Sequence, residues 1–344
     1  MEKNIYFKLF ACCIPVKGYG RSALYDLQRN SFEYIPNLLF ELLEDCKNLS
    51  KADLQEKYQA DEWPGINKFF SYLEENEYGF WTRTPEEFPD LSMQWDHPGK
   101  LTNAIVEYKV GYSPFKLNSV FNSLEQLRCS DIQLRLFGDC SLKLIKGVIE
   151  SLYGRYFCVI DLFIPHSDKL DVEELLVLLK SEHRIIPLTI YNCKNKEVKN
   201  YINEDDKFLL SRVHITGENF YPGKVKEQVS LGTFYVNTEF FSESYSFNTG
   251  LNRKLCIDID GNIKNHISHK TVFGNICNDN PADIIESPAF QKLWKIKNDN
   301  IEICNVCEHR YMCMHNSDII YKKGKAYKKQ LCNYNPVTQN WKED

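Results

Sequence analysis

Long apolar runs, an excess of positive charge and a secretory leader are all missing from this sequence. No run reaches the roughly 18 residues of a membrane span, and the net charge of −5 argues against a general nucleic-acid surface. The first residues contain neither a basic leader nor a small-residue cleavage site, so we expect a strand there rather than a signal peptide. The expectation is a cytoplasmic protein that binds neither membrane nor nucleic acid.

Common signatures of nucleotide-binding and hydrolytic enzymes are missing as well. The sequence contains no G-x-x-x-x-G-K-[ST] phosphate loop and no G-x-S-x-G nucleophile turn. Gly18 and Gly20 begin like a dinucleotide-binding loop, but Ala23 stands at the third glycine position. Sequence motifs therefore name no catalytic residue, and these stay unknown.

Cysteines, by contrast, are abundant in a chain that is large enough for two or three domains. The 344 residues are 43% hydrophobic and 26% charged, and 13 are cysteine. In a cytosolic protein such cysteines indicate metal or redox chemistry rather than disulfides. Seven lie scattered in apolar segments and are expected to be buried as small hydrophobic side chains. They are Cys12, Cys13, Cys46, Cys129, Cys140, Cys158 and Cys193.

Residues 1–90 are predicted to form a winged-helix-like domain. Short β-branched and aromatic strands precede three amphipathic helices, and a strand at GFWTR (79–83) closes the unit. Pro36 and Ser50 stand where the first two helices begin. The order resembles precursor-peptide recognition domains, which add a leader peptide as a strand to their sheet edge. A winged helix that only packs against its neighbours fits the pattern equally well.

Residues 101–235 are predicted to form a partial parallel β/α barrel. Strands rich in Ile, Val and Leu alternate with helices, which is typical of parallel β-α units. Four or five units are too few for a full eight-unit barrel, so a partial barrel or a small open sheet fits. A polar, proline-rich linker at 85–100 precedes this region. The fold class is therefore α/β.

The alternation stops near residue 236, and the rest of the chain carries the strongest motif. Cys304, Cys307 and Cys313 have the spacing C-x2-C-x5-C, and Cys332 follows after a hydrophilic loop. Because a C-x2-C turn places two thiolates on one loop, the four predict a single zinc ion or an iron–sulfur cluster. We also expect a helix at 288–296 and a solvated loop or hairpin at the basic run 322–329.

These cysteines resemble the second auxiliary cluster site of the SPASM domain, found at the C-terminus of many peptide-modifying radical enzymes. More narrowly, the chain resembles the grasp-with-spasm SPASM-domain peptide maturases. The segments that carry the likeness are KLFACCIPVKGYGRSALYDLQ (8–28), LNRK (251–254), IKNH (263–266), CNVCEHRYMC (304–313) and CNYNPVTQNW (332–341). The resemblance implies that residues 236–344 are a SPASM-like metal-binding domain.

Several cysteines of that pattern are replaced in this chain. The first cluster site has Gly250-Leu251 ahead of the hairpin, His266 after it, and Asn316 shortly after Cys313. The sequence leaves open whether His266, His269 or Cys256 form a second metal site, and it favours none. The loop after the first predicted barrel strand, GYSPFKLNS (111–119), lacks the C-x3-C-x2-C triplet that radical S-adenosylmethionine enzymes need. We therefore expect no S-adenosylmethionine.

Three functions compete on this evidence. The first is a maturation factor for a ribosomally made, post-translationally modified peptide, without radical catalysis; the resemblance implies that it binds the precursor leader and assists an ATP-grasp ligase. The second is a redox or metal-dependent peptide-modifying enzyme that uses the four-cysteine site as an iron–sulfur cluster. The third, a zinc-stabilised transcription factor, is disfavoured because the third helix carries Lys68 against Glu74, Glu75 and Glu77.

Overall fold

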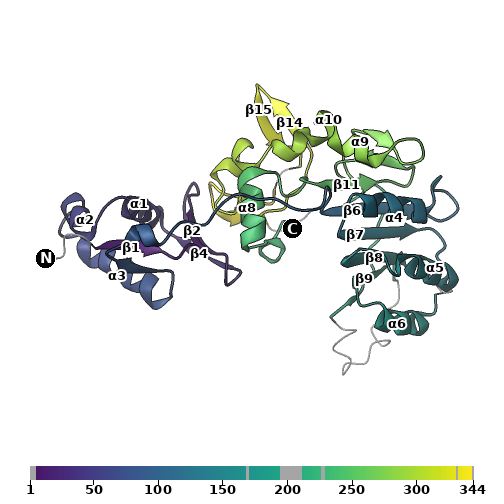
Figure 1. The fold of residues 1–344 in the computed structure, drawn as a ribbon, viewed down its shortest axis with the longest axis horizontal. Helices are drawn as coiled ribbons and strands as arrows, with labels where there is room; N and C mark the ends of the chain where they lie inside the picture. Colours follow the sequence, from purple (N-terminus) through teal and green to yellow (C-terminus); the bar gives the residue numbers. More distant parts are fainter. Residues whose placement is uncertain (1–4, 168–169, 194–210, 226–228, 331, 343–344) are drawn as a thin grey trace.

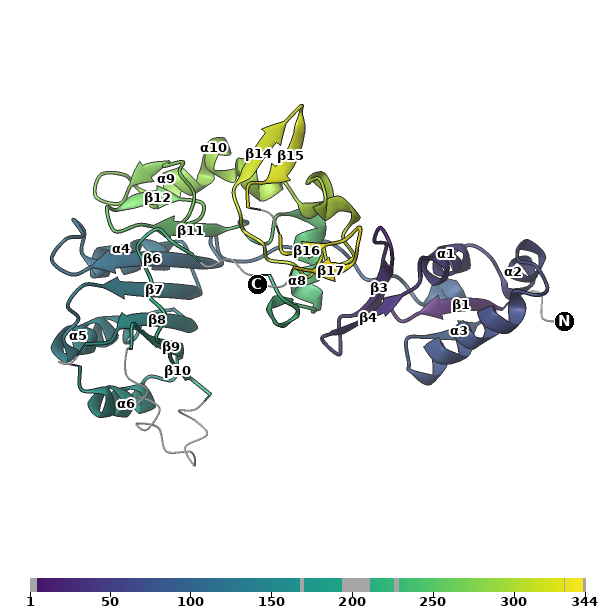
Figure 2. The same cartoon turned by 180° about the vertical axis from the view of Figure 1, so that it is seen from behind.

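The computed structural model describes residues 5–167, 170–193, 211–225, 229–330 and 332–342. Three parts lie in a row in Figure 1, with the N-terminal strands and helices at one end and a parallel sheet at the other. The C-terminal segment returns to lie between them, as the view from behind in Figure 2 also shows. The cysteines of the predicted metal site therefore lie in the middle of the molecule.

The N-terminal part contains two small antiparallel sheets and three helices in the predicted order. Strands β2, β3 and β4 form a meander, and β1 pairs with β5. The elements are β1 (Tyr6–Leu9), β2 (Cys13–Val16), β3 (Ser22–Asp26), β4 (Ser31–Ile35), α1 (Asn37–Cys46), α2 (Lys51–Lys57), α3 (Trp63–Glu75) and β5 (Gly79–Thr82).

Local sequence explains where these helices begin. Ser50 caps α2 through a capping box, because its Oγ accepts from Asp53 N and Asp53 Oδ2 accepts from Ser50 N. Pro36 precedes α1, whose Leu39, Leu42 and Leu43 face the core. The linker that follows contains one short turn, η1 (Pro85–Glu87).

The large sheet has eight strands in the order β10-β9-β8-β7-β6-β11-β12-β13. The alternating elements predicted from sequence are present: β6 (Asn103–Lys109), α4 (Leu117–Gln126), β7 (Asp131–Phe137), α5 (Leu142–Leu152), β8 (Val159–Pro165), α6 (Val172–Ser181), β9 (Ile185–Tyr191) and β10 (Val213–Ile215). The sequence FLLSRVHI (208–215) predicts a further strand; β10 covers its last three residues, and residues 208–210 lie outside the described residues.

This sheet continues beyond the point where the sequence alternation stops. Strand β11 (Lys254–Ile257) pairs in parallel with β6, and β12 (Asn262–Lys264) and β13 (Gly274–Asn275) add two antiparallel strands. The mixed α/β class is confirmed. The domain boundaries stay a prediction, and one near residue 236 would separate strands of a single hydrogen-bonded sheet.

The two faces of the large sheet differ in chemistry because side chains alternate along each strand. Val106, Leu134 and Leu162 face the helices in the largest apolar core. On the opposite face, Arg135 of β7 lies 3.6 Å from the Glu107 carboxylate of β6. That face therefore holds buried charge.

The C-terminal segment is richer in short helices than the sequence suggests. The expected helix at 288–296 is split into α10 (Pro288–Gln291) and the 3-10 turn η4 (Lys292–Lys295). Helices α8 (Thr238–Ser246) and α9 (Pro281–Glu286) were not expected, although Asn237 and Asn280 cap them. The remaining elements are η3 (Leu231–Thr233), η5 (Asn298–Asn300), η6 (Cys304–Val306), β14 (Ile319–Lys322), β15 (Lys325–Lys328), β16 (Tyr334–Asn335) and β17 (Asn340–Trp341).

The basic run at 322–329 is confirmed as a hairpin. Strands β14 and β15 pair antiparallel across Lys323 and Gly324, which have φ of 50° and 79°.

Most of the seven scattered cysteines are buried as expected, but Cys158 is exposed and Cys12 only half-buried. That expectation was wrong for Cys158, which immediately precedes β8 at the surface.

Candidate metal centre and its contacts

The four cysteines of the predicted metal site come from two separate stretches. Cys304 lies in η6 and Cys307 ends that turn, where Cys307 N donates to Cys304 O at 3.0 Å. Cys313 follows on the same stretch, and Cys332 precedes β16. The backbone before the turn is unusual, because the β-branched Ile303 has a φ of 75°.

The four thiols belong to half-buried cysteines that share one environment. Burial, together with the neighbouring thiols of Cys304 and Cys332, raises the pKa of Cys313 to about 12. The pKa of Cys307 is raised by burial and, among other causes, by Cys313 and Cys304. The pKa values of Cys304 and Cys332 are also raised, again first by burial. Such thiols are protonated at neutral pH, and metal binding would displace the protons.

The donor set fits a thiophilic centre, but the sulfurs are not gathered within ligand distance. Among the residues that the structure describes, two groups of three possible ligand atoms lie within 4.8 Å of one another, and neither contains the four cysteines. Four half-buried thiols in one neighbourhood have the chemistry of a closed tetrahedral site. The four-cysteine site therefore stays a prediction.

One of the two compact groups points to a residue that sequence reasoning missed. Cys307, Glu308 and His309 form it, with Cys307 Sγ 3.8 Å from His309 Nδ1. Burial lowers the pKa of His309 to about 4, so the ring is neutral, as a metal ligand must be. The signal was present in the sequence as a histidine two residues after Cys307.

Glu308 joins this cysteine segment (residues 304–313) to the N-terminal part. Its fully buried carboxylate accepts from Arg21 Nε at 2.8 Å and from Tyr334 OH. Its carbonyl oxygen accepts from Tyr25 OH at 2.8 Å, and Tyr34 OH lies 2.8 Å from His309 Nε2. Strands β3 and β4 therefore contact the residues that directly follow Cys307.

An apolar core surrounds these polar contacts. It joins β2 and β3 with the linker, helix α8 and the cysteine segment. Its buried members are Val16, Ala23, Tyr25, Leu27, Val236, Phe241, Tyr311 and Met312. A cavity of about 770 Å³ opens beside it, bounded by β1, β2, α1, the linker, α8, Arg310 and Tyr311.

Three positions where the resemblance expects first-site cysteines come together in the structure. Asn316 Nδ2 donates to His266 Nε2 at 2.9 Å, although the two residues are 50 positions apart. A Cβ added at Gly250 would lie 3.0 Å from Asn316 Cα. Hydrogen bonds and close packing therefore fill the place that the resemblance assigns to the first cluster.

The remaining candidates for a second site do not join that contact as a compact ligand group. His269 Nε2 lies 3.1 Å from Asn316 O, whereas Cys256 Sγ donates to Asn265 O at 3.8 Å. Burial lowers the pKa of His266 to about 3, so its ring is neutral. Within the described ranges, no set of three ligand atoms at most 4.8 Å apart includes His266, His269 or Cys256.

Comparison with known proteins gives little beyond this geometry. Neither a protein-family model nor a curated protein matches the chain. Among solved structures, Streptococcus suis SuiB bound to S-adenosylmethionine is similar at a TM-score of 0.27 and 10% identity, covering 91% of this chain and 93% of SuiB. A second SuiB structure gives 0.27, 9%, 91% and 94%. A TM-score of 0.27 is too low to support an inference about fold or activity.

The described part of the chain contains no helix that is a candidate for a membrane span. None of its helices combines the length and the apolar character needed to cross a bilayer.

Proposed function

We propose that the chain is a maturation factor for a ribosomally made, post-translationally modified peptide. It binds the precursor leader through its N-terminal sheet and assists an ATP-grasp ligase, without radical S-adenosylmethionine catalysis. The single observation that carries the proposal is an open strand edge, on β4, whose own residues contact the cysteine segment. The ligase partner rests on the family resemblance alone.

Backbone pairing identifies β4 as the edge that can accept a strand. Leu27 N donates to Cys12 O, which extends the β2–β3 ladder by one hydrogen bond. This bond shows which residues of β3 direct their backbone N–H and C=O groups toward β2. Because facing directions alternate, Phe32 and Tyr34 of β4 point their N–H and C=O groups away from β3. Over the described ranges, no backbone group outside the sheet bonds to these two residues.

The opposite edge of the same meander is blocked. By the same alternation, Cys13 and Pro15 of β2 face outward. Pro15 has no N–H, and Cys13 N already donates to Phe10 O at 2.8 Å. An incoming strand would therefore find acceptors but no donors on β2, which favours β4.

A peptide on β4 would lie next to the predicted metal centre. Phe32 and Tyr34 both contact the His309 ring, with centroids 5.9 and 5.6 Å apart. A closed metal centre with four protein ligands has no open position for catalysis. It would instead contribute folding free energy to the cysteine segment that contacts β4. We propose that the metal supports the platform on which the leader is held.

The proposal is tested first by searching the genes beside this one for a short precursor peptide and an ATP-grasp ligase, and then by pull-down with the two encoded proteins as prey. A chain that captures neither one would rule out the maturation role.

A redox enzyme is the second candidate, because four thiolates also suit an iron–sulfur cluster. Anaerobic purification followed by absorption spectra and metal analysis separates the two, since one zinc without a visible chromophore removes the redox version.

Strand addition at β4 is tested by Tyr34→Pro with Tyr34→Ala as the matched control. Both changes remove the phenol that contacts His309, but only proline removes the outward N–H. We expect Tyr34→Pro to bind the leader about fivefold to tenfold more weakly than Tyr34→Ala, the equivalent of roughly one hydrogen bond. Fluorescence anisotropy with labelled leader measures this, and equal affinities would place the leader elsewhere.

A further inference from the structure

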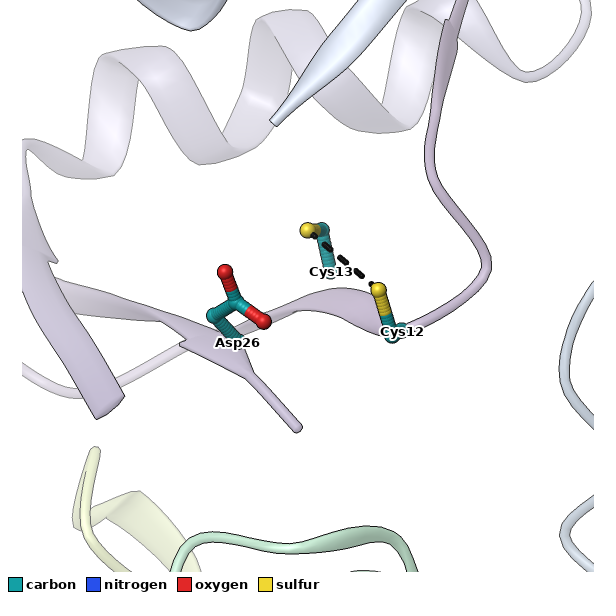
Figure 3. A group of neighbouring side chains, drawn as sticks. All are labelled: Cys12, Cys13 and Asp26. Atoms are coloured by element: carbon teal, nitrogen blue, oxygen red, sulfur yellow. Dashed lines mark hydrogen bonds between the residues drawn. The ribbon is translucent and has the colours of Figure 1, made fainter. Parts of the chain in front are cut away.

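A second group of ligand-type side chains lies in the N-terminal part, outside the cysteine segment. Cys13 begins β2, Cys12 directly precedes it in the turn after β1, and Asp26 ends β3. Cys13 and Asp26 are direct partners across the β2–β3 ladder, so their side chains emerge on the same face. Figure 3 shows the two sulfurs and the carboxylate turned toward one another.

The spacing of these atoms suits one tetrahedral ion. The two sulfurs are 3.9 Å apart, and both lie within 4.8 Å of a carboxylate oxygen of Asp26. Two thiolates that bind one zinc ion at about 2.3 Å are roughly 3.8 Å apart in tetrahedral geometry. The sulfurs therefore need little movement to share an ion.

A cavity gives the group access to solvent and room for a fourth ligand. It has a volume of about 250 Å³ and is lined by Phe10, Cys12, Cys13, Asp26, Gln28, Arg29 and Glu77. Gln28 Oε1 lies 3.7 Å from Cys12 Sγ, so this amide or a water can take the remaining position.

The surroundings of Asp26 also fit a metal site. Its buried carboxylate accepts from Gln28 N and Arg29 N through Oδ1, and from Arg29 Nη1 at 3.0 Å through Oδ2. These bonds orient the carboxylate and leave a lone pair on Oδ2, as partners behind metal ligands do. Two thiolates and one carboxylate carry three negative charges, which a divalent ion and Arg29 together balance.

We propose that Cys12, Cys13 and Asp26 form a second metal site for a thiophilic divalent ion such as Zn²⁺. The ion would tie the β1–β2 turn to the β3–β4 turn. This site is independent of the four-cysteine site and of the proposed function. Cys13 is buried in the N-terminal core as expected, and this proposal adds a ligand role to it and to the half-buried Cys12.

Metal stoichiometry tests the proposal on the full-length chain. The chain is stripped with chelator, loaded with Zn²⁺, desalted, and analysed for zinc per chain. We expect Cys12→Ser/Cys13→Ser to hold one ion fewer than the unchanged chain. Cys46→Ser, a buried thiol of the same core outside the group, is the control and should lose none. Unchanged zinc in the double variant, or an equal loss in Cys46→Ser, overturns the site.

A milder pair of variants keeps the test valid if the double variant does not fold. Cys12 is only half-buried, so Cys12→Ser disturbs the core little. Loading with Cd²⁺ should give less thiolate-to-metal charge-transfer absorbance in Cys12→Ser than in the unchanged chain. Asp26→Asn keeps an acceptor for the two backbone N–H groups and should weaken Cd²⁺ binding at least tenfold. Identical spectra and affinities in all three proteins would refute the proposal.

Discussion

At the scale of single residues, Asp161 shows that an ionised carboxylate on the buried polar face of the large sheet lowers the stability of the fold. The Asp161 carboxylate accepts from Gln133 Nε2 at 2.5 Å, while its other oxygen is buried without a hydrogen-bond partner among the described residues. Burial raises the pKa of Asp161 to about 6 from 3.8, with Gln133 and Arg135 opposing the shift. Ionised Asp161 is therefore less stable in the fold than in the unfolded chain.

The sign of this shift gives a pH prediction for Asp161→Asn. A raised carboxyl pKa means that the stabilising contribution is complete below about pH 4 and is lost as the pH rises through about 6. Asparagine keeps an acceptor for Gln133 and cannot ionise, so the variant should be more stable by up to about 2 kcal/mol at pH 7. Urea unfolding from pH 4 to pH 8 measures the difference.

The control for this experiment is Asp90→Asn, an exposed carboxylate of the linker that pairs with Lys8. Its pH profile should follow that of the unchanged chain. A steady offset in Asp161→Asn across the whole range would show that ionisation of Asp161 is not the cause.

Sequence reasoning at this scale named the cysteines of one motif but not their surroundings. Cys304, Cys307 and Cys313 stand out because their spacing is local. His309 was missed although it stands two residues after Cys307, and its contacts with Tyr34 and Phe32 could not be foreseen because only folding brings these distant residues to the ring. The contact between His266 and Asn316 could be anticipated only through the family resemblance.

At the scale of elements, Gly18 decides how closely the N-terminal strands approach the cysteine segment. A Cβ at this position would lie 2.3 Å from Arg21 O and 2.9 Å from Glu308 Cβ. The first contact would distort the β2–β3 turn that contains both Gly18 and Arg21, and the second would push this turn away from the cysteine segment. Gly18 is therefore needed for close packing between the β2–β3 turn and the cysteine segment, and not for a nucleotide-binding motif.

Gly18→Ala should destabilise the protein by about 1–3 kcal/mol, because overpacking there separates Arg21 from Glu308. The matched control is Gly65→Ala in α3, where an added Cβ meets nothing within 4 Å. That change should stabilise by roughly 0.5–1 kcal/mol, since alanine is the better helix former. Thermal unfolding followed by circular dichroism compares them, and effects of the same sign would contradict this account.

Elements whose signals are local were predicted well, and those that depend on distant partners were not. The capping residue Ser50 and the alternation of β6 to β9 with α4 to α6 could be read from adjacent residues. The pairing of β11 with β6 joins residues about 150 positions apart, so no local pattern signals it. Helix α8 was missed because its apolar residues, such as Phe241, serve a core shared with the N-terminal strands.

At the scale of the whole molecule, the cysteine segment is the connection between the two ends. It contacts the N-terminal strands through Glu308, His309 and Arg310, and the chain around it leads back into the large sheet through β11 to β13. Figure 2 shows the C-terminal strands between the N-terminal part and that sheet. A change in this segment should therefore be felt at both ends.

Cys307→Ser tests that connection. If the four cysteines hold one ion, losing a thiolate should release it, because ligation free energy is folding free energy in such sites. Segment 304–313 would then no longer hold Glu308 and His309 against β3 and β4. We expect one metal ion fewer per chain, a melting temperature lower by on the order of 10 °C, and faster tryptic cleavage after the exposed Arg83, at the start of the linker.

Cys158→Ser is the control, since this thiol is exposed and belongs to neither proposed metal site. It should leave metal content, melting and cleavage unchanged. The tryptic readout separates two explanations that metal content alone would merge. If Cys307→Ser loses its ion but the linker stays protected, the metal does not hold the N-terminal part in place, and the Arg21–Glu308 contact and the apolar core around Tyr25 suffice by themselves.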